Sequence, residues 1–222
     1  MQKRKILFGS YDTAEVGLWT LNAWDLSPAV YKSTLVEVPG RDGDLDLSTA
    51  LTNGEPRYHS RTLTVRLESS EGDRLERQAR IDTMTNWLSG WSMDIILPDD
   101  DLHYITGRVQ VSQEYNDPAH AAVTVTAVCE PWRYAVVETV RTVEATAETA
   151  TVSLANMGRR SAVPTITITG TGASVALAYG AYSWQLGAGV YQLPDIVLPQ
   201  GVTDVTLSGS GSVEFRYREA VL

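Results

Sequence analysis

Three aspartates spaced two residues apart, at positions 42, 44 and 46, are the first side chains in this sequence that could do chemistry. Alternating carboxylates open the calcium loop of an EF-hand, which also needs a glycine at its sixth position and a glutamate at its twelfth. Counted from Asp42, the sixth residue is a leucine and the twelfth an asparagine, so the calcium pattern fails. The surrounding stretch, VPGRDGDLDLS, contains Pro-Gly and Asp-Gly pairs, which favour a chain reversal between two strands. We predict a turn here and no metal site.

The stretch PDDDLHY (98–104) is the densest acidic cluster, and His103 lies two residues beyond its last aspartate. It could hold a divalent cation, or it could be a turn between two strands, because aspartate side chains bond to the backbone in turns. We favour the turn. The other histidines, His59 and His120, show no metal-ligand spacing with it. No metal and no cofactor is therefore predicted.

Candidate catalytic groups are equally sparse. Cys129 is the only cysteine, which rules out an internal disulfide, and its strand-like apolar surroundings predict a buried, inert thiol. The stretch GAGVYQ (187–192) lacks the third glycine of a dinucleotide loop and precedes a predicted strand instead of a helix. No nucleophile motif and no recognisable pair of carboxylates is present. We predict that the protein is not an enzyme and that its function lies in its surfaces.

The elements that would position these surfaces are mostly short strands. Apolar and polar residues alternate at 61–67, 92–97 and 122–129, which predicts strands with one buried face. The stretch 70–90 has a helical period, acidic residues near its start and Gly90 at its end, and it predicts one amphipathic helix packed on a sheet. The side chains expected on its core face are Leu75, Ala79, Ile81, Met84, Trp87 and Leu88.

The composition changes between residues 135 and 145, beyond which the chain is rich in Thr, Ser, Val, Ala and Gly and has no helical period. Short strands separated by Gly and Pro are typical of a β-sandwich. We therefore predict two domains, residues 1–140 and 141–222. The strands expected in the second domain are 164–170, 173–179, 182–189, 190–201, 202–211 and 212–219.

Size and charge narrow the function further. The chain has 222 residues and a net charge of −9, and residues 1–144 carry 22 acidic side chains against 14 basic ones. An acidic surface does not grip a phosphate backbone, so a nucleic-acid-binding module is not predicted. No apolar run is long enough for a transmembrane helix, and the N-terminus lacks the apolar core of a signal peptide. We expect a protein made and kept in the cytosol.

Several sequence motifs follow one another in a recognisable order. A Pro-Gly-Arg-Asp-Gly turn (39–43) precedes the helix, and an Asp-rich turn followed by Tyr and Gly-Arg (98–108) comes after it. A Cys-x-Pro-x-x-Tyr segment (129–134), an Asn-x-Gly pair before PTITI (156–168) and a Tyr-Arg near the C-terminus complete the order. This order resembles the distal tail protein (Dit) family of phages with long, non-contractile tails and of prophages of Gram-positive bacteria.

The resemblance covers essentially the whole chain and implies a structural role at the tip of a phage tail. It implies a homo-hexameric ring that joins the tail tube to the tail-associated fibre or lysin protein and leaves a central channel through which DNA passes. The N-terminal domain would be a β-sandwich with one helix and a protruding hairpin, and it would form the ring. The C-terminal domain would be a galectin-like β-sandwich. Such a protein assembles in the host cytoplasm, ends up in the virion and does not insert into a membrane.

Under this resemblance, the turn at 38–48 becomes the end of an arm that reaches a neighbouring subunit. The residues predicted at that interface are Pro39, Gly40, Arg41, Asp42, Gly43 and Asp44. A competing hypothesis from another class is a carbohydrate-binding β-sandwich protein, because aromatic rings can stack on sugars. The residues that would do so are Tyr179, Tyr182, Trp184 and Tyr191.

Overall fold

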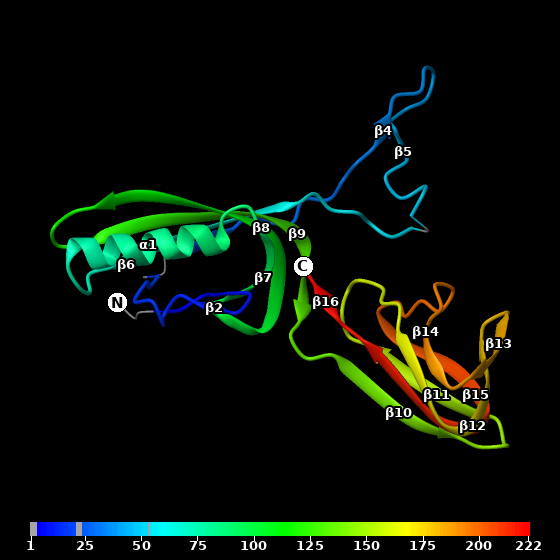
Figure 1. Ribbon diagram of the computed structural model, residues 1–222. Helices are drawn as coiled ribbons and strands as arrows, with labels where there is room; N and C mark the ends of the chain where they lie inside the picture. Colours follow the sequence, from blue (N-terminus) through cyan, green and yellow to red (C-terminus); the bar gives the residue numbers. More distant parts are fainter. Residues whose placement is uncertain (1–3, 21–23, 53) are drawn as a thin grey trace. The chain divides into compact units, whose positions relative to one another are not determined.

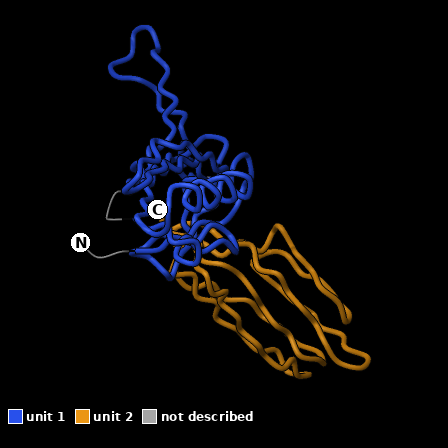
Figure 2. The backbone as a smooth tube through the Cα atoms, turned by 60° about the vertical axis from the view of Figure 1, so that its left-hand side comes forward, with its two compact units in different colours: residues 1–133 blue, residues 134–222 orange. Residues whose placement is uncertain are grey.

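The computed structural model describes residues 4–20, 24–52 and 54–222, and the chain is mainly antiparallel β with one helix among the described residues. It forms two compact units, residues 1–133 and 134–222 (Figures 1 and 2). The predicted mainly-β fold with a single helix is confirmed. Independent folding of two domains with a boundary at residue 140 stays a prediction. No described helix is both long and apolar enough to cross a membrane.

The first unit contains a large sheet with strand order β2-β1-β7-β8-β9-β6-β3, one helix and a small two-stranded ribbon, β4-β5. Its elements are β1 (Leu7–Phe8), β2 (Tyr11–Asp12), β3 (Trp24–Leu26), β4 (Leu35–Val36), β5 (Leu45–Asp46), β6 (Arg61–Ser69), α1 (Arg74–Leu88), β7 (Ser92–Leu97), β8 (Asp100–Asn116) and β9 (Ala121–Ala135).

The alternation read from the sequence sets the inner face of this sheet. In β6, Leu63, Val65 and Leu67 are buried, while the residues between them are more exposed. Their antiparallel partners in β9 are also apolar and buried, because directly opposed residues of an antiparallel pair point to the same face. The strands predicted at 61–67, 92–97 and 122–129 are all present, and two of them extend further than predicted.

Helix α1 begins at an N-cap that its sequence encodes. The Asp73 carboxylate accepts hydrogen bonds from the backbone N–H groups of Leu75 (2.8 Å) and Glu76 (2.9 Å). The Glu76 side chain in turn accepts one from the Asp73 N–H, which completes a capping box. Gly90, two residues beyond the helix, has a φ of +87°. The helix spans Arg74–Leu88 and is therefore shorter than the predicted 70–90, because Asp73 is the N-cap residue that precedes its first turn.

The core face of α1 differs in part from the prediction. Ile81, Met84 and Leu88 are buried as expected, but the fourth buried residue is Arg77, whose guanidinium donates to two backbone carbonyl groups. The spacing of 77, 81, 84 and 88 keeps one stripe on one side of a helix with 3.6 residues per turn. Three residues predicted for this stripe lie off it and are exposed: Leu75, Ala79 and Trp87.

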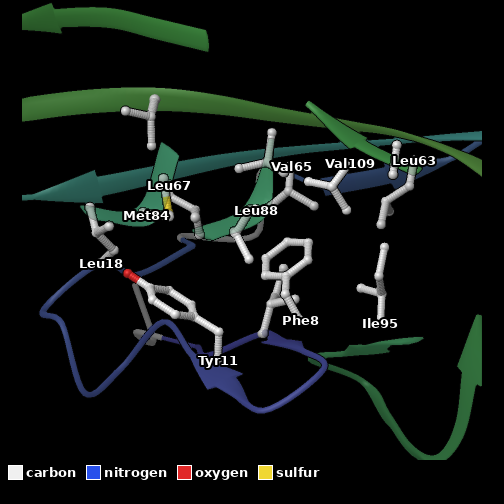
Figure 3. Packing of buried hydrophobic residues seen from close by; sticks show 14 of the residues in the cluster. Phe8, Tyr11, Leu18, Leu63, Val65, Leu67, Met84, Leu88, Ile95 and Val109 are labelled. Carbon is white, nitrogen blue, oxygen red and sulfur yellow. The ribbon is translucent and has the colours of Figure 1, made fainter. Parts of the chain in front are cut away.

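A single apolar cluster fills the space between the helix and the sheet (Figure 3). Phe8 and Tyr11 come from the first two strands and pack with Leu88 of the helix and Val65 of β6. Each of these side chains is at least nine-tenths buried. The N-terminal strands are thus held to the rest of the unit mainly by apolar burial, since their ladders with neighbouring strands are only two residues long.

The second unit is all β among its described elements. They are β10 (Thr139–Ala145), β11 (Ala150–Asn156), β12 (Thr165–Tyr179), β13 (Tyr182–Gly187), β14 (Gly189–Gln192), β15 (Gly201–Tyr217) and β16 (Ala220–Val221). The long strands β12 and β15 pair with each other along most of their length. The C-terminal half of β15 also pairs with β10, and its N-terminal half pairs with β11. In the same way, β12 pairs first with β14 and then with β13.

Glycines bend these two strands where their halves meet. The register of β12 against β15 shifts between Thr169 and Ser174, and Gly170, Gly209 and Gly211 there have φ near +130°. A Cβ atom on Gly209 would lie 2.1 Å from the backbone oxygen of Ser174, so no larger residue fits. Both halves contribute to one apolar cluster, so the bent sheet folds over a common core. The segments predicted as separate strands at 164–170 and 173–179 are one strand, and so are 202–211 and 212–219.

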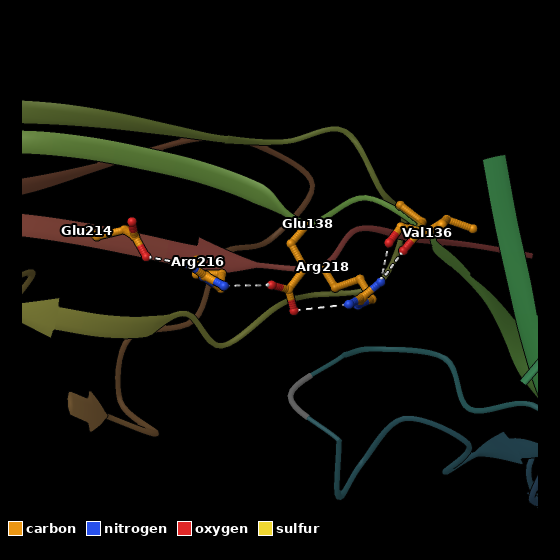
Figure 4. A network of polar contacts seen from close by, with 6 residues as sticks. Val136, Glu138, Glu214, Arg216 and Arg218 are labelled. Carbon is orange, nitrogen blue, oxygen red and sulfur yellow. Dashed lines mark hydrogen bonds and ion pairs between the residues drawn. The ribbon is translucent and has the colours of Figure 1, made fainter. Parts of the chain in front are cut away.

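Two polar clusters hold the ends of this unit. The buried side chain of Asn156 donates to the carbonyl groups of Arg160 (2.9 Å) and Leu198 (2.8 Å) and accepts from the N–H of Gly158 (3.0 Å). Around the start of β10, Glu138 pairs with Arg218 (3.0 Å) and lies 3.6 Å from Arg216 (Figure 4). These bonds fix irregular backbone, and the Asn-x-Gly motif noted in the sequence is therefore structural.

Candidate functional site

The most distinctive surface feature is an arm, residues 28–60, that projects from the first unit between β3 and β6 (Figures 1 and 2). Backbone bonds hold its base: Lys32 N–H donates to the Arg57 carbonyl (2.7 Å), and His59 N–H to the Val30 carbonyl (2.8 Å). The β4-β5 ribbon follows, with Leu35 opposite Asp46. The arm is therefore an extended hairpin, and side-chain contacts add to its backbone bonds: the Thr34 N–H donates to the Ser48 hydroxyl (2.8 Å), and the Tyr58 ring at its base lies against that of Trp132.

All six residues predicted at a subunit interface lie together at the end of this arm. They are Pro39, Gly40, Arg41, Asp42, Gly43 and Asp44, in the loop between β4 and β5, and all are exposed. Gly40 and Gly43 have φ of +80° and +74°, which explains why the loop needs glycine at these places. The structure places these residues at an accessible tip, and their role at an interface stays a prediction.

None of the described residues of the arm is buried, so they form no apolar core of their own. Leu35, Val36 and Leu47 are 55%, 40% and 41% exposed, and Leu51 is 98% exposed. A two-stranded ribbon alone is at best marginally stable in water, and it gains stability when an apolar face is covered. The signal in the sequence was the apolar residues on both sides of the Gly-rich turn, in STLVEV and DLDL.

Asp46 and Asp100, one aspartate from each acidic stretch, have structural partners. Asp46 accepts a hydrogen bond from the Ser48 N–H (2.8 Å), and the bonds from Ser48 hold the pKa of its carboxyl below the usual range. Asp100 accepts from Arg133 (2.7 Å) and lies 2.8 Å from His103 Nδ1, in the hairpin between β7 and β8. Across the described residues, no group of three or more His, Cys, Asp or Glu side chains is arranged to hold a metal ion.

The single thiol is buried between strands. Cys129 is 1% exposed. Its sulfur lies close to Gly107, only 2.5 Å from the position that a Cβ atom on that residue would occupy. Burial raises the pKa of the Cys129 thiol to about 11, so the reactive thiolate is disfavoured at neutral pH. The prediction of an inert, packed cysteine is consistent with this environment.

A second exposed apolar surface lies at the C-terminal end of α1, and we call it the helix-end surface: Trp87, Gly90, Trp91, Met93, Arg108 and Val128. Trp87 is 58% exposed and its ring lies against that of Tyr11, with ring centroids 6.1 Å apart, and Trp91 is 65% exposed. The sequence reading assigned Trp87 to the core and so missed this surface. The buried stripe of α1, formed by Arg77, Ile81, Met84 and Leu88, leaves Trp87 to one side of it and facing outward.

The four aromatic residues of the sugar-binding hypothesis lie in the second unit. Tyr179, Trp184 and Tyr191 are partly buried against its apolar cluster. The Tyr179 hydroxyl donates to the Val197 carbonyl (2.8 Å), and that of Tyr191 to the Gly187 carbonyl (3.2 Å). Tyr182 is 53% exposed and stacks on Trp184. Three of the four rings thus take part in packing, and no described feature favours a sugar-binding function.

Comparison with known proteins bears on the fold. No protein-family model and no curated protein sequence matches this chain. Among solved structures, it is similar to the crystal structure of the SPP1 Dit (gp 19.1) protein, described as a paradigm of the hub adsorption apparatus in phages that infect Gram-positive bacteria. The TM-score is 0.66 over 98% of this chain and 99% of that chain, at 15% sequence identity. The chain therefore has the Dit fold, as the order of its motifs predicted.

Proposed function

We propose that this chain is a distal tail protein, a structural component of a phage tail. The observation that carries the proposal is the likeness in fold to SPP1 Dit over nearly the whole of both chains. A match confined to one β-sandwich would be weak support, because such folds host many functions. Here the match extends over both compact units, one of which carries a helix and a projecting arm. No residue is assigned a catalytic role.

In this role the chain forms a homo-hexameric ring through its first unit, with the arm as one contact. A cyclic ring needs two different patches on each subunit, because its contacts are head-to-tail. The arm suits such a contact, since it projects from its unit and exposes apolar side chains that its own chain leaves uncovered. Arg41 at its tip can pair with a carboxylate of the neighbour. The ring joins the tail tube to the tail-associated fibre or lysin protein.

The charge of the chain fits a ring with a central channel for DNA. Each copy carries a net charge of −9, and most of this excess lies in the part of the chain that forms the ring. Acidic walls repel phosphates, so DNA would pass without being held. The protein would therefore reside in the virion at the tail tip, after assembly in the host cytoplasm.

The test is the oligomeric state of the full chain. Light scattering at rising concentration, followed by negative-stain images with and without tube protein, should reveal closed rings. The proposal would be abandoned if neither concentration nor tube protein ever produced a ring.

The role of the arm has its own test. Deleting residues 40–44 should leave a folded monomer, because the base of the arm keeps its backbone bonds. Arg41→Glu should weaken the ring by making one side of a charge pair repulsive. Arg74→Glu, the same change at an exposed position of α1, is the matched control and should assemble like the wild type. Rings of normal yield without residues 40–44 would show that the tip is not an interface.

A further inference from the structure

We propose that the helix-end surface of one copy receives the arm of a second copy. This inference rests on the proposed function and names the patch that completes the head-to-tail contact. Both surfaces belong to the first unit, and both remain exposed in the single chain. One chain therefore carries the two unlike halves of a possible contact.

The helix-end surface is hollowed on one side of the segment 89–91. A hollow of about 460 Å³ opens there, and most of the surface that lines it is apolar. Trp87, Trp91 and Met93 line it together with Phe8 and with Gly9 and Ser10 in the turn after β1. At this hollow Trp87 is 58% exposed and Trp91 is 65% exposed. Large exposed aromatic rings beside a cavity are typical of binding anchors.

A second hollow, of about 470 Å³, lies on the other side of the same segment. Arg108 and Val128 line it, and Val128 is 63% exposed. The Arg108 guanidinium donates to the Gly90 carbonyl (2.9 Å), which places it beside Trp91. Within the described part of the chain, no carboxylate forms an ion pair with Arg108. Ser89, Gln110 and Thr126 also line this second hollow, so the helix-end surface combines one mainly apolar hollow, one of mixed polarity and an exposed positive charge.

The arm matches this combination in both respects. Its ribbon exposes the apolar side chains of Leu35, Val36 and Leu47. Its tip, residues 37–46, carries four carboxylates against the single guanidinium of Arg41. Apolar side chains can enter the hollows while Asp46, next to Leu47 in the ribbon, lies near Arg108, and Arg41 at the far end of the arm reaches a carboxylate of the neighbour beyond the helix-end surface. The occupant is a second copy of this chain, because every copy carries one arm and one helix-end surface. Repeating this contact between two different patches from copy to copy can close a ring.

Cysteine cross-linking between two separately made full-length chains tests the pairing directly. One chain carries Leu47→Cys and the other, marked by a tag of different length, carries Trp91→Cys. Mixed under assembly conditions and oxidised, they should give a disulfide-linked heterodimer, because a disulfide needs Cα atoms within about 7 Å. Cys129 is buried and should not take part. Leu75→Cys, at an exposed position near the other end of α1, is the matched partner and should give little heterodimer.

Assembly of aromatic variants gives the second measurement. Trp91→Ala and Trp87→Ala should keep the circular dichroism spectrum of the wild type, since both rings are exposed, but should reduce ring yield at least tenfold. Leu75→Ala is the control and should assemble normally. The inference would be overturned, and the proposed function left standing, if wild-type rings formed, the tryptophan variants assembled equally well, and the Leu47→Cys and Trp91→Cys chains gave no heterodimer. Absence of rings from the wild type, with and without tube protein, would overturn both.

Discussion

Replacement of Gly107 by alanine tests how Cys129 is packed in the first unit. A methyl group at position 107 would lie 2.5 Å from the Cys129 sulfur, far inside van der Waals contact. Its next neighbours, the Cys129 Cα and the Val128 carbonyl oxygen, would be 3.3 Å away, a distance that small shifts can accommodate. The sulfur is therefore the main obstacle, and removing it should relieve most of the clash.

This geometry sets the expected free energies of unfolding. Overpacking by one methyl group costs about 1–3 kcal/mol, so Gly107→Ala should destabilise the protein by about 2 kcal/mol. Cys129→Ala removes one buried atom of methylene-like size and should cost about 1 kcal/mol. In the double variant the new methyl occupies the space of the lost sulfur. If the two single destabilisations simply added, the double variant would lose about their sum. We expect its loss of unfolding free energy to be smaller than that sum by at least about 1 kcal/mol.

Urea unfolding followed by tryptophan fluorescence is the appropriate assay. Five of the six tryptophans lie in residues 1–133, so the signal reports mainly on the first unit. A shift of the midpoint at unchanged slope measures the change in stability. Ala79→Leu is the control: it also adds apolar volume to the first unit, but at an exposed position of α1, and the expected change is within about 0.5 kcal/mol. If the costs at 107 and 129 simply added, the sulfur would not be the obstacle and the packing argument would be wrong.

Four further outcomes are expected. Asp73→Ala should lower the free energy of unfolding by about 1 kcal/mol, because two backbone N–H groups lose their acceptor; Asp82→Ala, exposed on the same helix, should cost less, and equal costs in urea unfolding would contradict the cap. Because burial raises the pKa of Cys129 to about 11, the thiol should be protonated at pH 8 and should react with Ellman's reagent only on unfolding; labelling of the native protein at the unfolded rate would refute this. EDTA should leave the melting temperature unchanged, whereas a fall of several degrees that calcium reverses would restore a metal site. Residues 134–222 expressed alone should give a β-type circular dichroism spectrum with a cooperative melt, since they hold their own apolar cluster; a disordered spectrum would show that the units do not fold separately.

Local chemistry was enough to predict several features from the sequence. The alternation in RTLTVRL predicted β6 and its buried face, because successive side chains of a strand point to opposite sides. The Pro-Gly and Asp-Gly pairs predicted the reversal at the arm tip, since Gly40 and Gly43 adopt positive φ. The order of such local signals along the chain was sufficient to suggest the Dit fold.

Features that depend on distant partners could not be read in this way. Gly170 and Gly211 look like strand ends in the sequence, but pairing between β12 and β15 continues past them and makes them bends within single strands. Arg77 is buried because carbonyl groups of Gly72 and, 40 residues away, Asp117 accept its hydrogen bonds. Trp87 lies beside the stripe to which Arg77 belongs, and its exposed ring forms part of the helix-end surface. A sequence determines backbone preference and side-chain period residue by residue, whereas the register of long strands and the phase of a helix are settled by contacts between segments far apart in the chain, and only the tertiary structure contains those.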